Sequence, residues 1–123
     1  MVILNGILIS GFGEGKFYMQ KYSDNFRDKL GYIPWLGTLN IKINSKINIS
    51  KDCVVIDGFN EAEKTFGSIK CYPCIINNKN IKVNLVVPEI NKHKENIIEL
   101  ISPLNLRKTL NIKDGDEINI KLI

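Results

Sequence analysis

Short runs of apolar and β-branched residues recur along this chain, some continuous and some alternating with polar residues, and both patterns predict β-strands. Strands are predicted at residues 2–9, 17–20, 38–43, 52–56, 68–76, 81–87, 97–101 and 117–123. Turn-forming residues separate them at intervals of roughly eight to twelve residues, and the run 77–80 predicts a tight hairpin turn. The pattern favours a mainly β fold, a small barrel with short connecting helices.

Two short helices are predicted between the strands. The first covers residues 25–30 and ends at Gly31, which suits a left-handed C-terminal cap. The second begins at Ser102, a good N-cap, with Pro103 at the first helical position. Segment 61–67 fits either the tip of a hairpin or a helical turn, and the sequence leaves both open.

Length and charge narrow the classes of function. With 123 residues the chain suits one domain, 1–123, with its own core. The net charge of +4 comes from 17 Lys and Arg against 13 Asp and Glu, and the lysines are scattered along the chain. This distribution favours a small anionic ligand over nucleic acid. No apolar run reaches the length of a membrane span, and the apolar start lacks the features of a signal peptide.

Three cysteines, Cys53, Cys71 and Cys74, are an odd number that argues against a disulfide framework and favours a reducing, cytoplasmic setting. Cys71 and Cys74 have the C-x-x-C spacing that is also found in redox-active and zinc-binding sites. Both fall inside a β-branched apolar segment, so two small buried strand residues are the favoured interpretation. His93 lies in a loop rich in Lys and Glu and is read as a solvated histidine.

A glycine-rich segment follows the first strand. Gly11, Gly13 and Gly15 alternate with other residues and lead into Lys16. Glycines let the backbone approach a ligand closely, and successive N–H groups can form a nest for an anion beside the lysine charge. The spacing matches neither the dinucleotide fingerprint nor the P-loop. A plain hairpin turn is an equally good interpretation.

The stretch 37–40, with sequence Gly-Thr-Leu-Asn, opens another predicted strand. Residues two apart on a strand share a face, so Thr38 and Asn40 point the same way while Leu39 points to the core. Two neutral oxygen donors suit Mg²⁺, which takes few protein ligands and completes its shell with water and phosphate. The alternative is an ordinary polar strand face.

Three further residues have two interpretations each. Trp35 either stacks on an aromatic ligand or is a packing residue, and packing is favoured. Glu99 is either an outward-facing strand residue or an acceptor placed in a pocket. Arg107 is either a phosphate clamp or a surface arginine covering apolar area.

The ordered set of motifs resembles the archaeal CTP-dependent riboflavin kinases. It comprises the runs at 11–16, 37–40, 102–107 and 114–116, which read GFGEGK, GTLN, SPLNLR and DGD. The resemblance covers essentially the whole chain. It implies a six-stranded cradle-loop β-barrel and the kinase domain alone, without the N-terminal DNA-binding domain of some relatives. The implied reaction transfers the γ-phosphoryl group of CTP to the 5′-hydroxyl of riboflavin, giving FMN and CDP.

The resemblance also implies a set of site residues. Mg²⁺ would lie on Thr38 and Asn40. Flavin would contact Glu99, a candidate base, and Asn91, which replaces an expected threonine. The implied nucleotide contacts are Gly11, Phe12, Gly13, Glu14, Gly15, Lys16, Leu104, Asn105, Leu106 and Arg107.

Two other classes of function remain as alternatives. A small-barrel DNA-binding or transcription module also fits a DGD turn before a terminal strand, and a flavin carrier would bind without catalysis. The expected partners are CTP or CDP and riboflavin or FMN, with no nucleic acid and no membrane. A monomer is expected.

Overall fold

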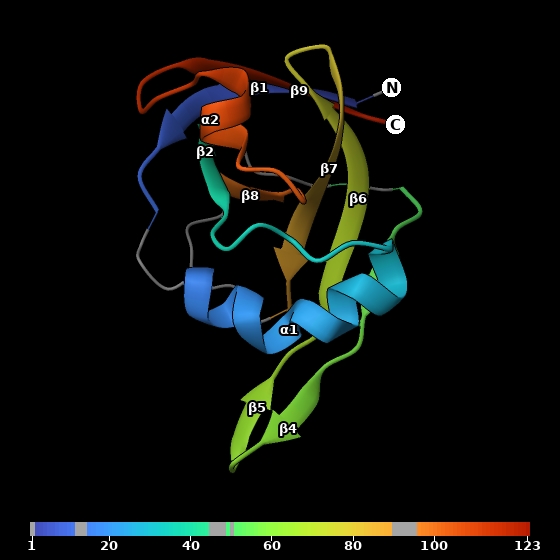
Figure 1. The fold of residues 1–123 in the computed structure, drawn as a ribbon. Helices are drawn as coiled ribbons and strands as arrows, with labels where there is room; N and C mark the ends of the chain where they lie inside the picture. Colours follow the sequence, from blue (N-terminus) through green and yellow to red (C-terminus); the bar gives the residue numbers. More distant parts are fainter. Residues whose placement is uncertain (1, 12–14, 45–48, 50, 90–95) are drawn as a thin grey trace.

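Six antiparallel strands close into a barrel in the computed structural model, which describes residues 2–11, 15–44, 49, 51–89 and 96–123. Within these residues the strand order is β6-β7-β8-β2-β1-β9, and β9 pairs back onto β6 to close the ring. The strands are β1 (Val2–Ile9), β2 (Leu39–Ile43), β6 (Ile69–Ile76), β7 (Lys79–Pro88), β8 (Ile97–Ile101) and β9 (Glu117–Leu122). The expected six-stranded barrel is confirmed (Figure 1).

Three short strands lie outside the closed ring. Strand β3 (Val54–Ile56) pairs with the first half of β6, on the edge that β9 occupies further along. Strands β4 (Phe59–Glu61) and β5 (Lys64–Phe66) form a separate hairpin that projects beyond the barrel (Figure 1). Ala62 and Glu63 at its tip both have positive φ, as in a tight primed turn. Segment 61–67 is therefore a hairpin tip and not a helical turn.

Helix α1 (Gly15–Leu30) corrects two predictions, because it includes the supposed strand 17–20 and begins ten residues before the predicted helix. Its buried side chains are Met19, Tyr22 and Phe26, a spacing of three and four that belongs to a helix. These three side chains pack on the outer face of β6, β7 and β8, the face turned away from the barrel interior. Their contacts there are Ile69, Cys71, Val86 and Ile101. The run of aromatic and apolar residues at 17–20 was too short to reveal this stripe.

Helix α2 (Leu106–Leu110) begins three residues later than predicted, with its N-cap at Asn105 instead of Ser102. The Ser102 hydroxyl donates to the Lys82 carbonyl at 2.7 Å and accepts from the Leu104 amide at 3.2 Å, which makes a turn instead of a cap. Asn105 is the N-cap, and its Oδ1 accepts from the Lys108 amide. The extra turn carries the chain from the end of β8 over one end of the barrel.

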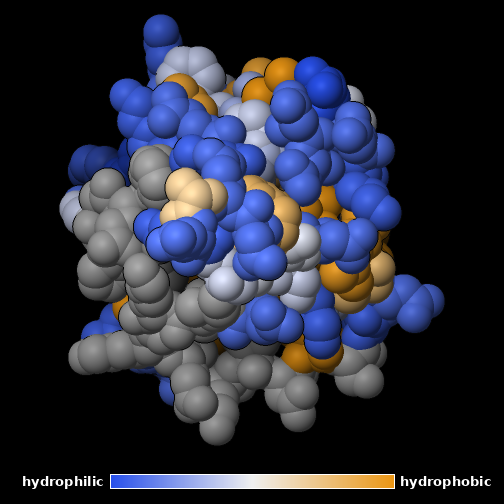
Figure 2. All heavy atoms as spheres, turned by 90° about the horizontal axis from the view of Figure 1, so that it is seen from below, coloured by the Kyte–Doolittle hydropathy of each residue, from blue (hydrophilic) through white to orange (hydrophobic). Residues whose placement is uncertain are grey.

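On the side of α1 and the β4–β5 hairpin, the part of the surface that the described residues form is mostly hydrophilic, with smaller apolar patches (Figure 2). The side chains of α1 that face away from the barrel are charged or polar, including Arg27, Asp28 and Lys29. Among the residues that the structure describes, no helix is long and apolar enough to span a membrane.

At Gly6 the backbones of β1 and β2 lie too close together for a larger residue. Replacing this glycine therefore tests the packing of these two strands in the barrel. A Cβ at this position would lie 2.5 Å from the Lys42 carbonyl oxygen and 2.6 Å from a methyl of Ile41. Backbone cannot move aside without breaking the pairing of Gly6 with Ile43. We expect Gly6→Ala to destabilise the fold by about 1–3 kcal/mol.

Thermal unfolding measures this loss as a lower Tm. The control is Ile3→Ala on the same strand, whose side chain is exposed. Its effect should be much smaller. A Gly6→Ala protein as stable as the parent would contradict the close approach.

Candidate functional site

Thr38 and Asn40 lie together on the outward face of β2. Leu39, Ile41 and Ile43 of the same segment fill the barrel interior, so Asn40 points to the opposite face. The Asn40 amide nitrogen lies 3.5 Å from the Thr38 hydroxyl and 3.4 Å from its carbonyl oxygen. A hydroxyl and a carboxamide are thus placed side by side, at the start of the strand.

Asn40 carries a buried acceptor without a partner. Its side chain is only 3% exposed, and its Oδ1 has no hydrogen-bond partner among the described residues. Leaving a buried polar atom without a hydrogen bond destabilises the folded protein by about 1–3 kcal/mol. Such an atom is therefore uncommon, and a bound ion or ligand is one explanation for it. A bound cation would satisfy this oxygen, and with Thr38 the site offers the oxygen ligands that Mg²⁺ accepts.

The glycine-rich segment begins directly against Asn40. Ile9, the last residue of β1, pairs with Asn40, and a Cβ on Gly11 would lie 2.9 Å from the Asn40 amide nitrogen. Helix α1 begins at Gly15, so the segment leads into a helix N-terminus, with Lys16 exposed in the first turn. Backbone N–H groups and the dipole make such a terminus attractive to phosphate. Phe12, Gly13 and Glu14 lie outside the described residues.

Glu99 lies beside Asn40 on the neighbouring strand. The two are directly opposite in the β2–β8 register, which places their Cβ atoms roughly 4.5–5.5 Å apart on one face. Glu99 is half-buried, and its other neighbour in register is Val86, which packs under α1. A carboxylate therefore lies next to the candidate metal site. Asn91 and His93 lie outside the described residues.

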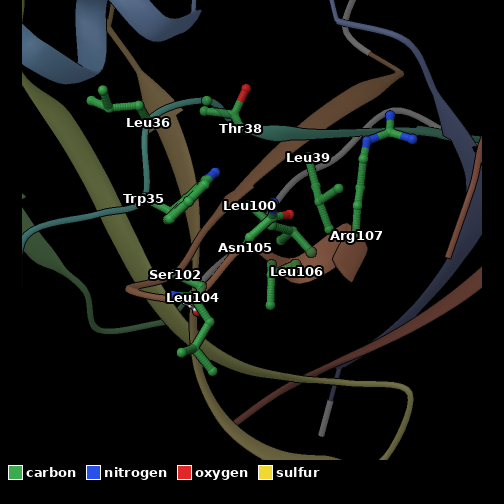
Figure 3. A pocket seen from close by; sticks show the side chains of 11 residues that line it. Trp35, Leu36, Thr38, Leu39, Leu100, Ser102, Leu104, Asn105, Leu106 and Arg107 are labelled. Atoms are coloured by element: carbon green, nitrogen blue, oxygen red, sulfur yellow. Dashed lines mark hydrogen bonds between the residues drawn. The ribbon is translucent and has the colours of Figure 1, made fainter. Parts of the chain in front are cut away.

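A hollow of about 250 Å³ lies between segments 35–39 and 100–107 at one end of the barrel (Figure 3). It brings Thr38 together with all four C-terminal nucleotide candidates, 104–107. Trp35 also lines it and is 52% exposed, so it is not a buried packing residue. The remaining lining residues are Leu36, Gly37, Leu39, Leu100 and Ser102, none of which has a chemical signature in the sequence.

Arg107 is held at the edge of the hollow by two contacts. Its Nη2 lies 2.8 Å from Asp114 Oδ1 and donates to the Ile9 carbonyl at 3.2 Å. The Ser10 hydroxyl donates to the same carboxylate. The Ser10 hydrogen bond and then the Arg107 guanidinium hold the pKa of Asp114 below its ordinary value. Sequence reasoning took Asp114 only as part of a turn, because 104 residues separate it from Ser10.

Cys71 and Cys74 face opposite sides of β6. Cys71 packs under α1, whereas Cys74 lies in the barrel interior. Side chains that point apart cannot share a metal or form a disulfide. Among the described residues all three cysteines are free, and no group of three or more His, Cys, Asp or Glu could hold a metal ion. The interpretation of these two as buried strand residues is confirmed.

Burial raises the pKa of both the Cys71 and the Cys74 thiol to about 12. At pH 8 only about one in ten thousand of each would be the reactive thiolate. We expect a thiol reagent at that pH to modify Cys53, which is partly exposed, and to spare the other two until the protein unfolds. Peptide mass mapping with and without denaturant measures this. Equal labelling of all three in the native protein would contradict their burial.

The sequence of this chain is similar to one group of known proteins, which are named riboflavin kinases. The family model CTP-dep_RFKase, described as "Domain of unknown function DUF120", matches residues 8–122. A protein of Methanocella arvoryzae named riboflavin kinase is 37% identical over 123 residues, covering 98% of this chain and 56% of the relative. Proteins of the same name from Pyrococcus furiosus and Thermococcus kodakarensis are 38% and 39% identical, each covering 98% of this chain. The chain spans 58% and 59% of those two relatives, so it matches little more than half of their length.

Proposed function

This chain belongs to the CTP-dependent riboflavin kinase family, and we propose on that premise that it transfers the γ-phosphoryl group of CTP to the 5′-hydroxyl of riboflavin. The products are FMN and CDP. A cytoplasmic location is part of the proposal, and the three free cysteines support it.

The observation that carries the proposal is the buried Oδ1 of Asn40, to which none of the described residues donates a hydrogen bond. It is buried beside the Thr38 hydroxyl, against the start of the glycine-rich segment. Thr38 and Asn40 would hold Mg²⁺ through their side-chain oxygens, leaving most of the shell to water and phosphate. Bound there, the ion would offset the negative charge of the triphosphate during transfer.

The groups around this position suit a triphosphate. The N-terminus of α1 and Lys16 lie at the end of the glycine-rich segment, and Arg107 lies beside the carbonyl of Ile9, from which that segment starts. Helix N–H groups, an ammonium and a guanidinium supply three kinds of phosphate contact. Phosphoryl transfer depends chiefly on such positioning and on neutralisation of charge.

Glu99 suits the acceptor side of the reaction. Its position opposite Asn40 places a carboxylate next to the proposed metal ligands. There it would accept a hydrogen bond from the 5′-hydroxyl of the ribityl chain and orient that oxygen toward the γ-phosphorus. Asn91 is proposed as the second flavin contact.

The test is to incubate the purified chain with riboflavin, Mg²⁺ and each of the four common ribonucleoside triphosphates, and to measure FMN. FMN with CTP is the expected result. FMN with ATP but not CTP would overturn the donor, and no FMN with any donor would overturn the kinase. Tight flavin binding without turnover would identify a carrier, and salt-dependent DNA binding without flavin binding would identify a DNA-binding module.

A further inference from the structure

Strands β1 and β9 form a stretch of the barrel wall that lies away from α1. In the closed ring β1 is opposite β7 and β9 is opposite β8, and β7 and β8 carry residues that pack under α1. Figure 1 shows β1 and β9 running side by side on the side of the barrel away from that helix. The outer face of these two strands is therefore far from the surface that α1 buries.

Exposed isoleucines lie on this outer face. Leu4 and Leu8 of β1 contact the barrel core, so the residues that alternate with them point outward. Ile3 and Ile7 are two of these outward residues, and they are 55% and 40% exposed. Ile123, directly after β9, is 59% exposed. Apolar side chains that gather on one exposed face indicate a surface that another molecule covers.

Two opposite charges accompany the isoleucines, on the outer face of β9. In the β1–β9 register Ile3 is opposite Lys121, and Ile7 is opposite Glu117. Lys121 and Glu117 are four residues apart on one strand, about 13 Å, which is too far for them to pair with each other. Neither forms an ion pair with any residue that the structure describes. The pattern favours a partner that supplies the opposite charges.

An asparagine pair lies at the middle of the face. Asn5 and Asn119 are opposite each other in register, and Asn119 Nδ2 donates to Asn5 Oδ1 at 2.8 Å. Two residues away on either side, β1 carries an isoleucine and β9 carries a charge. The apolar row is thus symmetric about this pair, whereas the two charges have opposite signs. A face with this pattern is complementary to itself.

We propose that this face binds a second copy of the chain in an antiparallel, two-fold arrangement. An axis parallel to the face, perpendicular to the strands and above the asparagine pair, places Ile3 over the partner's Ile7. The same axis places Lys121 over the partner's Glu117, and symmetry repeats each contact, so two apolar contacts and two ion pairs form. This departs from the monomer expected from the sequence.

The contact is only about two strands wide on a convex wall. It is therefore smaller than the roughly 800 Å² per partner of a standard stable interface, and association is expected to be weak. Sedimentation equilibrium of the intact chain from about 10 μM to 1 mM tests the proposal, because association follows mass action. The average mass should rise from 14.0 kDa, that of one chain, toward twice that value. A mass of 14.0 kDa at every concentration would overturn the proposal and leave the face to a different partner.

Charge reversals test the two ion pairs. Lys121→Glu brings like charges together twice, and so does Glu117→Lys, so each should weaken dimerisation about tenfold or more. The two variants change the net charge in opposite directions, so net charge cannot explain a loss in both. The double variant Lys121→Glu/Glu117→Lys recreates the opposite charges and should restore the dimer. Undiminished association of both single variants, or no recovery in the double variant, would overturn the arrangement.

Replacement of an isoleucine tests the apolar part of the face. Ile3→Ser should weaken dimerisation about tenfold, because the symmetry removes its apolar contact twice. The matched control is Ile33→Ser, since Ile33 is 51% exposed and lies between α1 and β2. It should leave association unchanged, and circular dichroism verifies that all variants fold. Loss of the dimer in Ile33→Ser but not in Ile3→Ser would place the interface elsewhere and overturn the proposal.

Discussion

Asn40→Ala is expected to lower Mg²⁺-dependent FMN formation about a hundredfold or more while leaving the fold intact. The variant removes the buried Oδ1, which has no hydrogen-bond partner in the part of the chain that the structure describes, and with it one of two proposed protein ligands of the metal. Stability should change little, because within the described part of the chain the side-chain amide makes only long hydrogen bonds of 3.4 and 3.5 Å, both to Thr38. The measurements are steady-state turnover at several Mg²⁺ concentrations and Tm.

Two variants separate the metal role from packing. Thr38→Val keeps the shape of the side chain but removes the hydroxyl, so it should also lose turnover, whereas Thr38→Ser should keep most of it. Lys42→Ala is the control, because Lys42 lies two residues along β2 on the same outward face and is exposed. Normal turnover in Asn40→Ala and Thr38→Val would reject these residues as metal ligands.

Arg107→Ala is expected to lower kcat/KM for CTP by about 10- to 100-fold, the usual worth of a charge-assisted contact to phosphate. The guanidinium lies at the edge of the hollow and within reach of the start of the glycine-rich segment. Arg107→Lys should recover only part of the loss, since an ammonium cannot make the planar two-pronged contact. Steady-state kinetics with CTP varied at saturating riboflavin measures the effect.

Arg107 also pairs with Asp114, so a structural role must be separated from phosphate binding. Asp114→Asn removes that ion pair but keeps the guanidinium. If Arg107 binds phosphate, Asp114→Asn should retain much more activity than Arg107→Ala. Lys108→Ala, the adjacent exposed residue of α2, serves as the charge control. Equal losses in Asp114→Asn and Arg107→Ala would show that only the ion pair matters.

The barrel strands were predicted well from the sequence, because the pattern of apolar and polar residues that marks a strand involves only neighbouring residues. Every predicted strand except 17–20 is present within a few residues, and Asn77 and Asn78 adopt the positive φ of a tight turn. The alternation along β2 also placed Thr38 and Asn40 on one side. A period of two is a property of consecutive residues, so it survives without knowledge of the rest of the fold.

What the sequence missed depends on contacts between distant segments. Helix α1 was misread in part because its apolar stripe is completed by strands more than thirty residues away. Ser102 looks like a helix cap, but its hydroxyl binds the Lys82 carbonyl instead. The exposure of Trp35 and the pairing of Arg107 with Asp114 could not be read from neighbouring residues at all.

The most direct measurement is a crystal structure of the chain with CDP and Mg²⁺. The expected result is one metal ion about 2.0–2.1 Å from Thr38 Oγ1 and Asn40 Oδ1, bridging to the phosphates beside the N-terminus of α1. A metal held by the nucleotide and water alone, with Asn40 Oδ1 still unpaired, would contradict the proposed site.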